Sequence, residues 1–170
     1  MYPIIAIVAP SGAGKTTLID RAIERLPNKL DRIQSFTTRP QRSEADALYY
    51  EFVTREEVEK RKTAGIVVQL IEFNGNYYGT DRPHVEKVLE QKFGILAVVE
   101  YGIKTFTDAG FKVVTIKIEP VGYASREGRS NADHERSQIS IPIDKVIVND
   151  FGEGGLEKAT EELVRFIAMI

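Results

Sequence analysis

The stretch APSGAGKTT, residues 9–17, constrains the fold of this chain more than any other feature. It follows β-branched and apolar residues over 2–9, which predict a strand buried on both faces, and it precedes apolar residues at helical spacing from Leu18 to Leu26. A glycine-rich turn between a strand and a helix can place consecutive backbone N–H groups and the positive end of the helix around an anion. The stretch therefore predicts a phosphate-binding loop.

The loop departs from the usual pattern at its first position, where Ala9 stands in place of glycine. Gly12 and Gly14 permit backbone conformations and close approaches that a Cβ would block. Lys15 is expected to bring positive charge to the outer phosphates, and the Thr16 hydroxyl is a candidate Mg²⁺ ligand. Because alanine adds only a methyl group, we expect phosphate binding to persist. The alternative is a glycine-rich turn that binds nothing.

Beyond the loop, strand and helix patterns alternate. Helices are expected near 54–63, 82–92 and 156–170, where Thr54 and Glu57 form a capping box for the first. Strands are expected at 66–73, 94–99, 112–118 and 144–150, with residues 33–38 extended and 74–80 forming a turn. This alternation predicts an α/β fold of the P-loop NTPase type, a parallel sheet with flanking helices. Its ligands would bind beyond the carboxyl ends of the strands.

Two stretches break the alternation, roughly 33–80 and the polar 119–142, and both are expected at the rim of the site. The remaining core would then comprise residues 1–32, 81–118 and 143–170 of a single domain of 170 residues.

Composition excludes several other classes of protein. The chain has no cysteine, so it has neither disulfides nor a thiolate metal site, and His84 and His134 are isolated. A formal charge of −2 argues against a general nucleic-acid coat. The apolar N-terminal run lacks a basic flank and is too short to span a bilayer. We therefore expect a cytoplasmic protein that binds neither nucleic acid nor membranes.

A second phosphate site is indicated by SFTTRPQRSEADALYYEFV, residues 35–53, and EFNGNYYGT, residues 72–80. Arg39 and Arg42 lie three apart on an expected extended segment and could clamp a phosphate by charge-assisted bonds. Tyrosine hydroxyls nearby could complete the shell. The alternative is a solvated surface loop with incidental arginines.

These motifs, in this order, resemble the guanylate kinase family. The family carries a loop like PSGAGKTTL, then Ser-x-Thr-Thr-Arg-x-x-Arg, then Gly-Asn-Tyr-Tyr-Gly-Thr/Ser, and it ends with a strand like DKVIVND and a last helix like LEKATEEL. The resemblance covers most of residues 4–170. It implies a core, a monophosphate-binding insert at about 33–80 and a lid at about 119–142, shorter here than in the family. It also implies transfer of the ATP γ-phosphate to GMP or dGMP with Mg²⁺, by a monomer or homodimer.

The resemblance also implies the site residues. Catalytic roles would fall on Lys15, Arg39, Arg129 and Arg136. ATP would contact Ser11, Gly12, Ala13, Gly14, Lys15, Thr16, Thr17, Arg126 and Asn149, and Thr16 would be the metal ligand. The monophosphate would contact Ser35, Arg39, Arg42, Tyr50, Gln69, Glu72, Tyr78, Gly79 and Thr80. We assign no general base, because phosphoryl transfer depends mainly on positioning and dispersed positive charge.

The sequence departs from the family pattern around the base and in the lid. The family reads guanine with a glutamate, whereas this chain has Gln69 at that position. Two aspartates at the end of a core strand are replaced by Ala97 and Val99, and Glu100 follows one residue later. Glu100 could turn toward the site or be an ordinary solvated carboxylate. In the short lid, Arg129 matches a family arginine best. Arg126 lies one position from another, and Arg136 is a positional guess, so each could be an ordinary surface charge.

Three alternatives to a GMP kinase follow. Gln69 would suit a thymine- or uracil-like edge, so the acceptor could be another monophosphate, such as a modified pyrimidine deoxynucleotide. The chain could also be a kinase-like binding module without catalysis, although such modules usually lose the glycine loop. The phosphate loop alone would also fit a kinase for a sugar bisphosphate.

Overall fold

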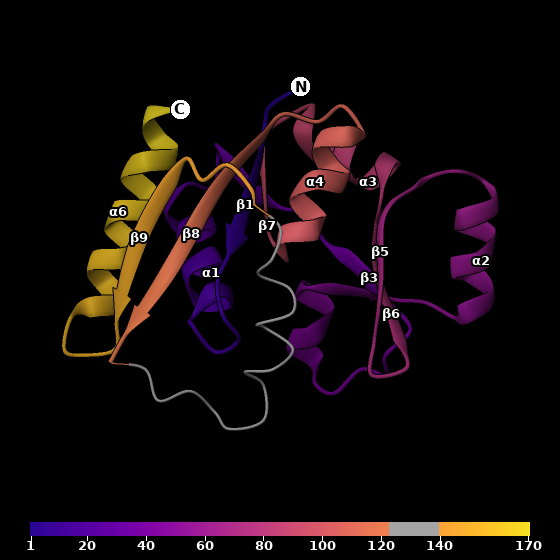
Figure 1. Ribbon diagram of the computed structural model, residues 1–170, viewed down its shortest axis with the longest axis horizontal. Coiled ribbons are helices and arrows are strands. Elements are labelled where there is room, and N and C mark those ends of the chain that lie inside the picture. The colour runs from indigo at the N-terminus through magenta and orange to yellow at the C-terminus, as the bar shows by residue number, and fades with distance from the viewer. Residues whose placement is uncertain (123–139) are drawn as a thin grey trace.

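The computed structural model of the protein describes residues 1–122 and 140–170 (Figure 1). Most of the expected lid lies outside these residues, together with its three candidate arginines, Arg126, Arg129 and Arg136. None of the helices in the described ranges is long and apolar enough to cross a membrane.

A five-stranded parallel sheet forms the core, in the order β2-β7-β1-β8-β9. The strands are β2 (Leu30–Arg32), β7 (Phe93–Ala97), β1 (Ile4–Val8), β8 (Val113–Val121) and β9 (Lys145–Asp150). All five residues of central strand β1 are buried, because helices cover both faces of the sheet. The predicted α/β fold with a parallel sheet and flanking helices is confirmed.

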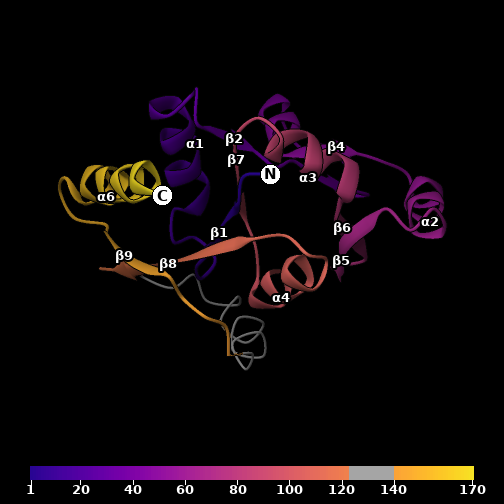
Figure 2. The ribbon, with the colours of Figure 1, turned by 90° about the horizontal axis from the view of Figure 1, so that it is seen from above.

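Two pairs of helices cover the two faces of this sheet (Figure 2). Helices α1 (Lys15–Arg25) and α6 (Gly155–Met169) pack against the face that carries Ile5 and Ile7. Helices α3 (Arg82–Leu89) and α4 (Glu100–Asp108) pack against the other face. Side chains of β1 alternate between the two apolar clusters, as the pleat of a strand requires.

A second, mixed sheet lies beside the core and is built entirely from residues 35–81. Its order is β4-β3-β6-β5, formed by β4 (Tyr50–Phe52), β3 (Ser35–Thr37), β6 (Asn76–Asp81) and β5 (Val67–Phe73). The short 3-10 helix η1 (Glu44–Leu48) precedes β4, and helix α2 (Arg55–Thr63) follows it. The Thr54 hydroxyl accepts a hydrogen bond from the Glu57 N–H at 3.1 Å and caps α2. This second sheet occupies most of the expected monophosphate-binding insert.

A polar contact joins the second sheet to the core. The Tyr49 hydroxyl donates to Asp20 Oδ2 on α1 at 2.8 Å, and Arg32 pairs with Asp20 Oδ1. The Arg32 guanidinium also lies over the Tyr49 ring, 4.6 Å from its centroid. Burial, followed by the bond to Asp20, raises the pKa of Tyr49. Asp20 of the core thus bonds the residue that directly precedes β4 of the second sheet.

One local expectation was wrong, and one helix was not foreseen. Residues 74–80 do not form one long turn: the turn is confined to Asn74 and Gly75, with φ of 49° and 73°, and the next residues form β6. Positive φ at two consecutive residues is the geometry of a tight hairpin turn, whose twist matches that of the strands. Helix α4 was not foreseen, because Gly102 and two threonines weaken its apolar pattern.

Candidate active site

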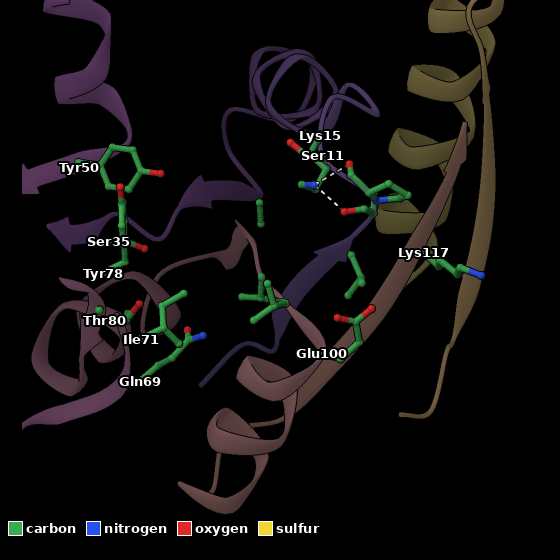
Figure 3. Close-up of a pocket in the computed structure, with 17 residues that line it drawn as sticks. Ser11, Lys15, Ser35, Tyr50, Gln69, Ile71, Tyr78, Thr80, Glu100 and Lys117 are labelled. Carbon is green, nitrogen blue, oxygen red and sulfur yellow. Dashed lines mark hydrogen bonds between the residues drawn. The ribbon is translucent and has the colours of Figure 1, made fainter. Parts of the chain in front are cut away.

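A cavity of about 440 Å³ opens between the phosphate loop and the second sheet (Figure 3). One wall is the loop with the end of β1, a second is formed by β3, β4, β5 and β6, and a third is the end of β7 with the start of α4. The cavity thus lies at the carboxyl ends of the parallel core strands, as expected for this type of fold. The residues lining it are Val8, Ala9, Pro10, Ser11, Lys15, Ser35, Tyr50, Gln69, Ile71, Tyr78, Gly79, Thr80, Ala97, Val98, Val99, Glu100 and Lys117.

The loop has the backbone geometry of an anion site. Gly12 and Gly14 have φ of 81° and 87°, in the left-handed region that favours glycine. Gly14 is the N-cap of α1, so the positive end of that helix faces the loop. Asn149 Nδ2 donates to the Ala13 carbonyl at 2.9 Å, and a Cβ on Gly14 would lie 2.7 Å from that nitrogen. Asn149 thus braces the loop from β9 and does not itself line the cavity.

The Lys15 side chain folds back onto the start of the loop. Its Nζ donates to the carbonyl oxygens of Ala9 at 2.6 Å and Pro10 at 3.0 Å, and it lines the cavity. The contact with Ala9 is made by backbone, so the replacement of glycine by alanine at this position leaves it intact. Ser11 also lines the cavity, whereas Gly12, Thr16 and Thr17 are exposed and do not.

The described residues offer few ligands for a Mg²⁺ ion. No group of three or more His, Cys, Asp or Glu within residues 1–122 and 140–170 could hold a metal. The Thr16 hydroxyl stands in the first turn of α1, at the end that faces the loop. Mg²⁺ keeps several waters and is commonly held by one or two protein groups together with substrate phosphates. A single hydroxyl is therefore consistent with an ion that arrives with a nucleotide.

Arg39 is held in place from several sides. The residue is only 8% exposed, and its guanidinium donates to Asp46 Oδ2 and to the Pro40 carbonyl, both at 3.1 Å. It also lies over the Tyr50 ring, 5.4 Å from the centroid. The Arg42 N–H donates to the same Asp46 oxygen at 2.9 Å. The bonds from Arg42 and Arg39 hold the pKa of Asp46 below its usual value.

The two predicted arginines therefore meet at Asp46, and neither lines the cavity itself. Tyr50 connects Arg39 to it, because its ring lies near the Arg39 guanidinium and also near the Tyr78 ring, with the two ring centroids 5.9 Å apart. Both tyrosines line the cavity. Burial raises the pKa of Tyr50, so its hydroxyl is a neutral hydrogen-bond donor at pH 7.

The far end of the cavity combines polar and apolar side chains. Gln69 and Ile71, two residues apart on β5, both face it, and Thr80 lies opposite Gln69 on β6. Ser35 on β3 joins them (Figure 3). Glu72, the other predicted residue of β5, is exposed and does not line the cavity, since successive residues of a strand point to opposite faces.

Lys117 and Glu100 are the charged cavity residues that the sequence did not assign to the site. Glu100 is the first residue of α4, and the start of this helix turns it toward the cavity. A sequence prediction of helix α4 would have indicated that Glu100 turns toward the cavity. Lys117 on β8 pairs with Glu119 at 2.9 Å.

Comparison with known proteins agrees with this geometry. The family model described as guanylate kinase matches residues 1–168. The guanylate kinase of Vibrio parahaemolyticus is 33% identical over 162 residues, which cover 85% of this chain and 78% of the relative. That of Chlamydia felis is 31% identical over 176 residues, covering 94% of this chain and 84% of the relative.

Among solved structures, guanylate kinase from Anaplasma phagocytophilum superimposes with a TM-score of 0.70 at 23% identity, over 99% of this chain and 85% of the other. At that identity the likeness shows the fold alone. Together with the family model and the sequence relatives, it shows that this chain belongs to the guanylate kinase family of ATP-dependent nucleoside monophosphate kinases.

Proposed function

We propose that the protein transfers the γ-phosphate of ATP to GMP or dGMP, giving ADP and GDP or dGDP. The observation that carries the proposal is that one cavity is lined both by Lys15 of the phosphate loop and by Tyr50, Gln69 and Thr80 of the second sheet. A phosphate donor and a nucleotide acceptor could therefore face each other in one space. Curated relatives named guanylate kinase support the same reaction.

In the proposed reaction, an oxygen of the acceptor phosphate attacks the γ-phosphorus of ATP while the bond from that phosphorus to the bridging oxygen of ADP breaks. Backbone N–H groups of the loop and the Lys15 ammonium would hold the β- and γ-phosphates. Arg39, Arg42 and the Tyr50 and Tyr78 hydroxyls would hold the acceptor phosphate. Each interaction positions an anion or disperses its charge, and this supplies most of the catalysis in phosphoryl transfer.

Mg²⁺ bound with ATP would neutralise charge on the phosphates, and Thr16 is the residue that would hold it. Arg39 would have to exchange at least part of its contact with Asp46 for the acceptor phosphate. Because Asp46 also accepts from the Arg42 N–H, its carboxylate would remain hydrogen-bonded during that exchange.

One observation supports a second candidate, a kinase for another nucleoside monophosphate. Gln69 lines the cavity, and the resemblance to the family implies an acid at this position. The binding module without catalysis is less well supported, because the loop retains its glycines and Lys15 lines the cavity.

The test is ADP release from MgATP with a panel of GMP, dGMP, AMP, CMP, UMP and dTMP. We expect the highest kcat/KM with GMP or dGMP. If a pyrimidine nucleotide gave the highest kcat/KM, the second candidate would be favoured. ADP release that no monophosphate stimulates would defeat both kinase assignments.

A further inference from the structure

The side-chain amide of Gln69 is a largely buried polar group that faces the cavity. The residue is 8% exposed and lines the cavity. Within the described part of the chain, its amide makes no hydrogen bond. Because burial of an unpaired amide costs free energy, a group supplied by a ligand is its natural partner.

A glycine on the neighbouring helix leaves room for this amide. Gly102 lies behind it on α4: a Cβ at Gly102 would stand 2.4 Å from Gln69 Nε2 and 3.0 Å from its Cδ. Only a glycine leaves that space for the amide. No hydrogen bond from residues 1–122 or 140–170 determines whether Oε1 or Nε2 is presented at a given point, so the bound base can select the orientation.

The chemistry of an amide differs from that of a carboxylate. A carboxylate only accepts, so it pairs with two donors, and on the edge of guanine these are N1–H and the 2-amino group. An amide offers one acceptor and one donor. It can accept from N1–H and donate to O6, and hypoxanthine presents the same two groups without a 2-amino group.

We propose that Gln69 pairs with the adjacent carbonyl and N–H of a 6-oxopurine and does not read the 2-amino group, so that the acceptor class includes IMP as well as GMP. This inference rests on the proposed function for the identity of the site. The Thr80 and Ser35 hydroxyls at the same end of the cavity can donate or accept, so neither requires an amino group.

The test is calorimetric titration of GMP and of IMP into the wild-type protein and Gln69→Glu, without ATP. The buffer is held at pH 8, because burial raises the pKa of a carboxyl group and the new glutamate must be ionised. We expect the wild type to bind the two nucleotides with similar Kd. The variant should favour GMP over IMP by about tenfold or more relative to the wild type, the value of one charge-assisted hydrogen bond. A smaller change in that ratio overturns the proposal.

Gln69→Met keeps the length of the side chain and removes both hydrogen bonds, so it tests the proposal if Gln69→Glu fails to fold. GMP and IMP should then both bind about tenfold more weakly, with ATP affinity unchanged. Unaltered affinity for both nucleotides would overturn the proposal.

Glu100→Gln is the matched control, since Glu100 is the single acid among the described residues that line the cavity. The ratio of GMP to IMP affinity should not change in this variant. A wild-type preference for GMP that disappears in Glu100→Gln would assign the 2-amino group to Glu100 and overturn the proposal. Because these titrations need no turnover, they can succeed even if the panel shows no ADP release, and the two assignments fail separately.

Discussion

The phosphate loop and the opposite wall of the cavity are built by different means. The loop depends on backbone: two glycines at positive φ, the start of α1, and carbonyl oxygens that receive Lys15. The opposite wall depends on side chains of four strands, and Arg39, which contacts Tyr50 of this wall without lining the cavity, is oriented by Asp46. A backbone site tolerates side-chain replacement, as at Ala9. A side-chain site changes its chemistry when one residue changes, as at Gln69.

The largest effect that this comparison predicts is that of Lys15→Ala. Lys15 is the one side chain on which the loop's charge depends, so kcat/KM should fall about a thousandfold. Because Lys15 is partly exposed and belongs to neither apolar cluster of the core, the thermal midpoint should change little. ADP-release kinetics and thermal denaturation measure the two quantities. Equal turnover in variant and wild type would contradict the role assigned to Lys15.

The next effect separates Arg39 from Arg42, the two arginines proposed to bind the acceptor phosphate. Arg39→Ala should lower kcat/KM for the monophosphate about a hundredfold and also lower the thermal midpoint, because it removes a buried cation from Asp46. Arg42→Ala should lower kcat/KM about tenfold without loss of stability, since its side chain is exposed and the bond to Asp46 comes from its backbone.

Steady-state kinetics with varied monophosphate and thermal denaturation of both variants provide the measurement. If both variants lost stability to the same degree, the distinction between a buried and an exposed arginine would be wrong.

The smallest effect concerns Asn149, whose side chain donates to the Ala13 carbonyl of the loop. Asn149→Ala leaves the Ala13 carbonyl without its donor, so the KM for ATP should rise about tenfold while the KM for the monophosphate stays unchanged. Asn149→Asp is a second variant: a carboxylate cannot donate to the carbonyl and adds negative charge beside the phosphate loop, so the KM for ATP should rise at least as much. An unchanged KM for ATP in both variants would show that the loop needs no support from β9.

The sequence was sufficient for the parts of the molecule that depend on local patterns. The strand before Ala9, the helix from Lys15 and the cap at Thr54 follow from periodicity and turn chemistry, and the structure confirms them. The contact between Arg39 and Asp46 could not be foreseen from the sequence. It depends on where the tertiary structure places η1, which carries Asp46, relative to the residues that follow β3. Glu100 was left undecided, because its direction depends on where α4 begins.

Gln69 shows a similar limit. Its position in the family pattern could be read from the sequence, whereas the absence of a partner for its amide within the described residues depends on Gly102 and on the packing of α4 against β5.

The link between the core and the second sheet has a consequence for stability. Asp20 accepts from Tyr49, which leads into the second sheet, and pairs with Arg32 within the core, so one aspartate contacts both parts of the molecule. Loosening of residues 35–81 would leave a carboxylate and a guanidinium of the core without the tyrosine that covers them. The hydrogen bond between Tyr49 and Asp20 thus contributes about 1 kcal/mol of coupling between the two sheets, which favours their unfolding in one transition on heating.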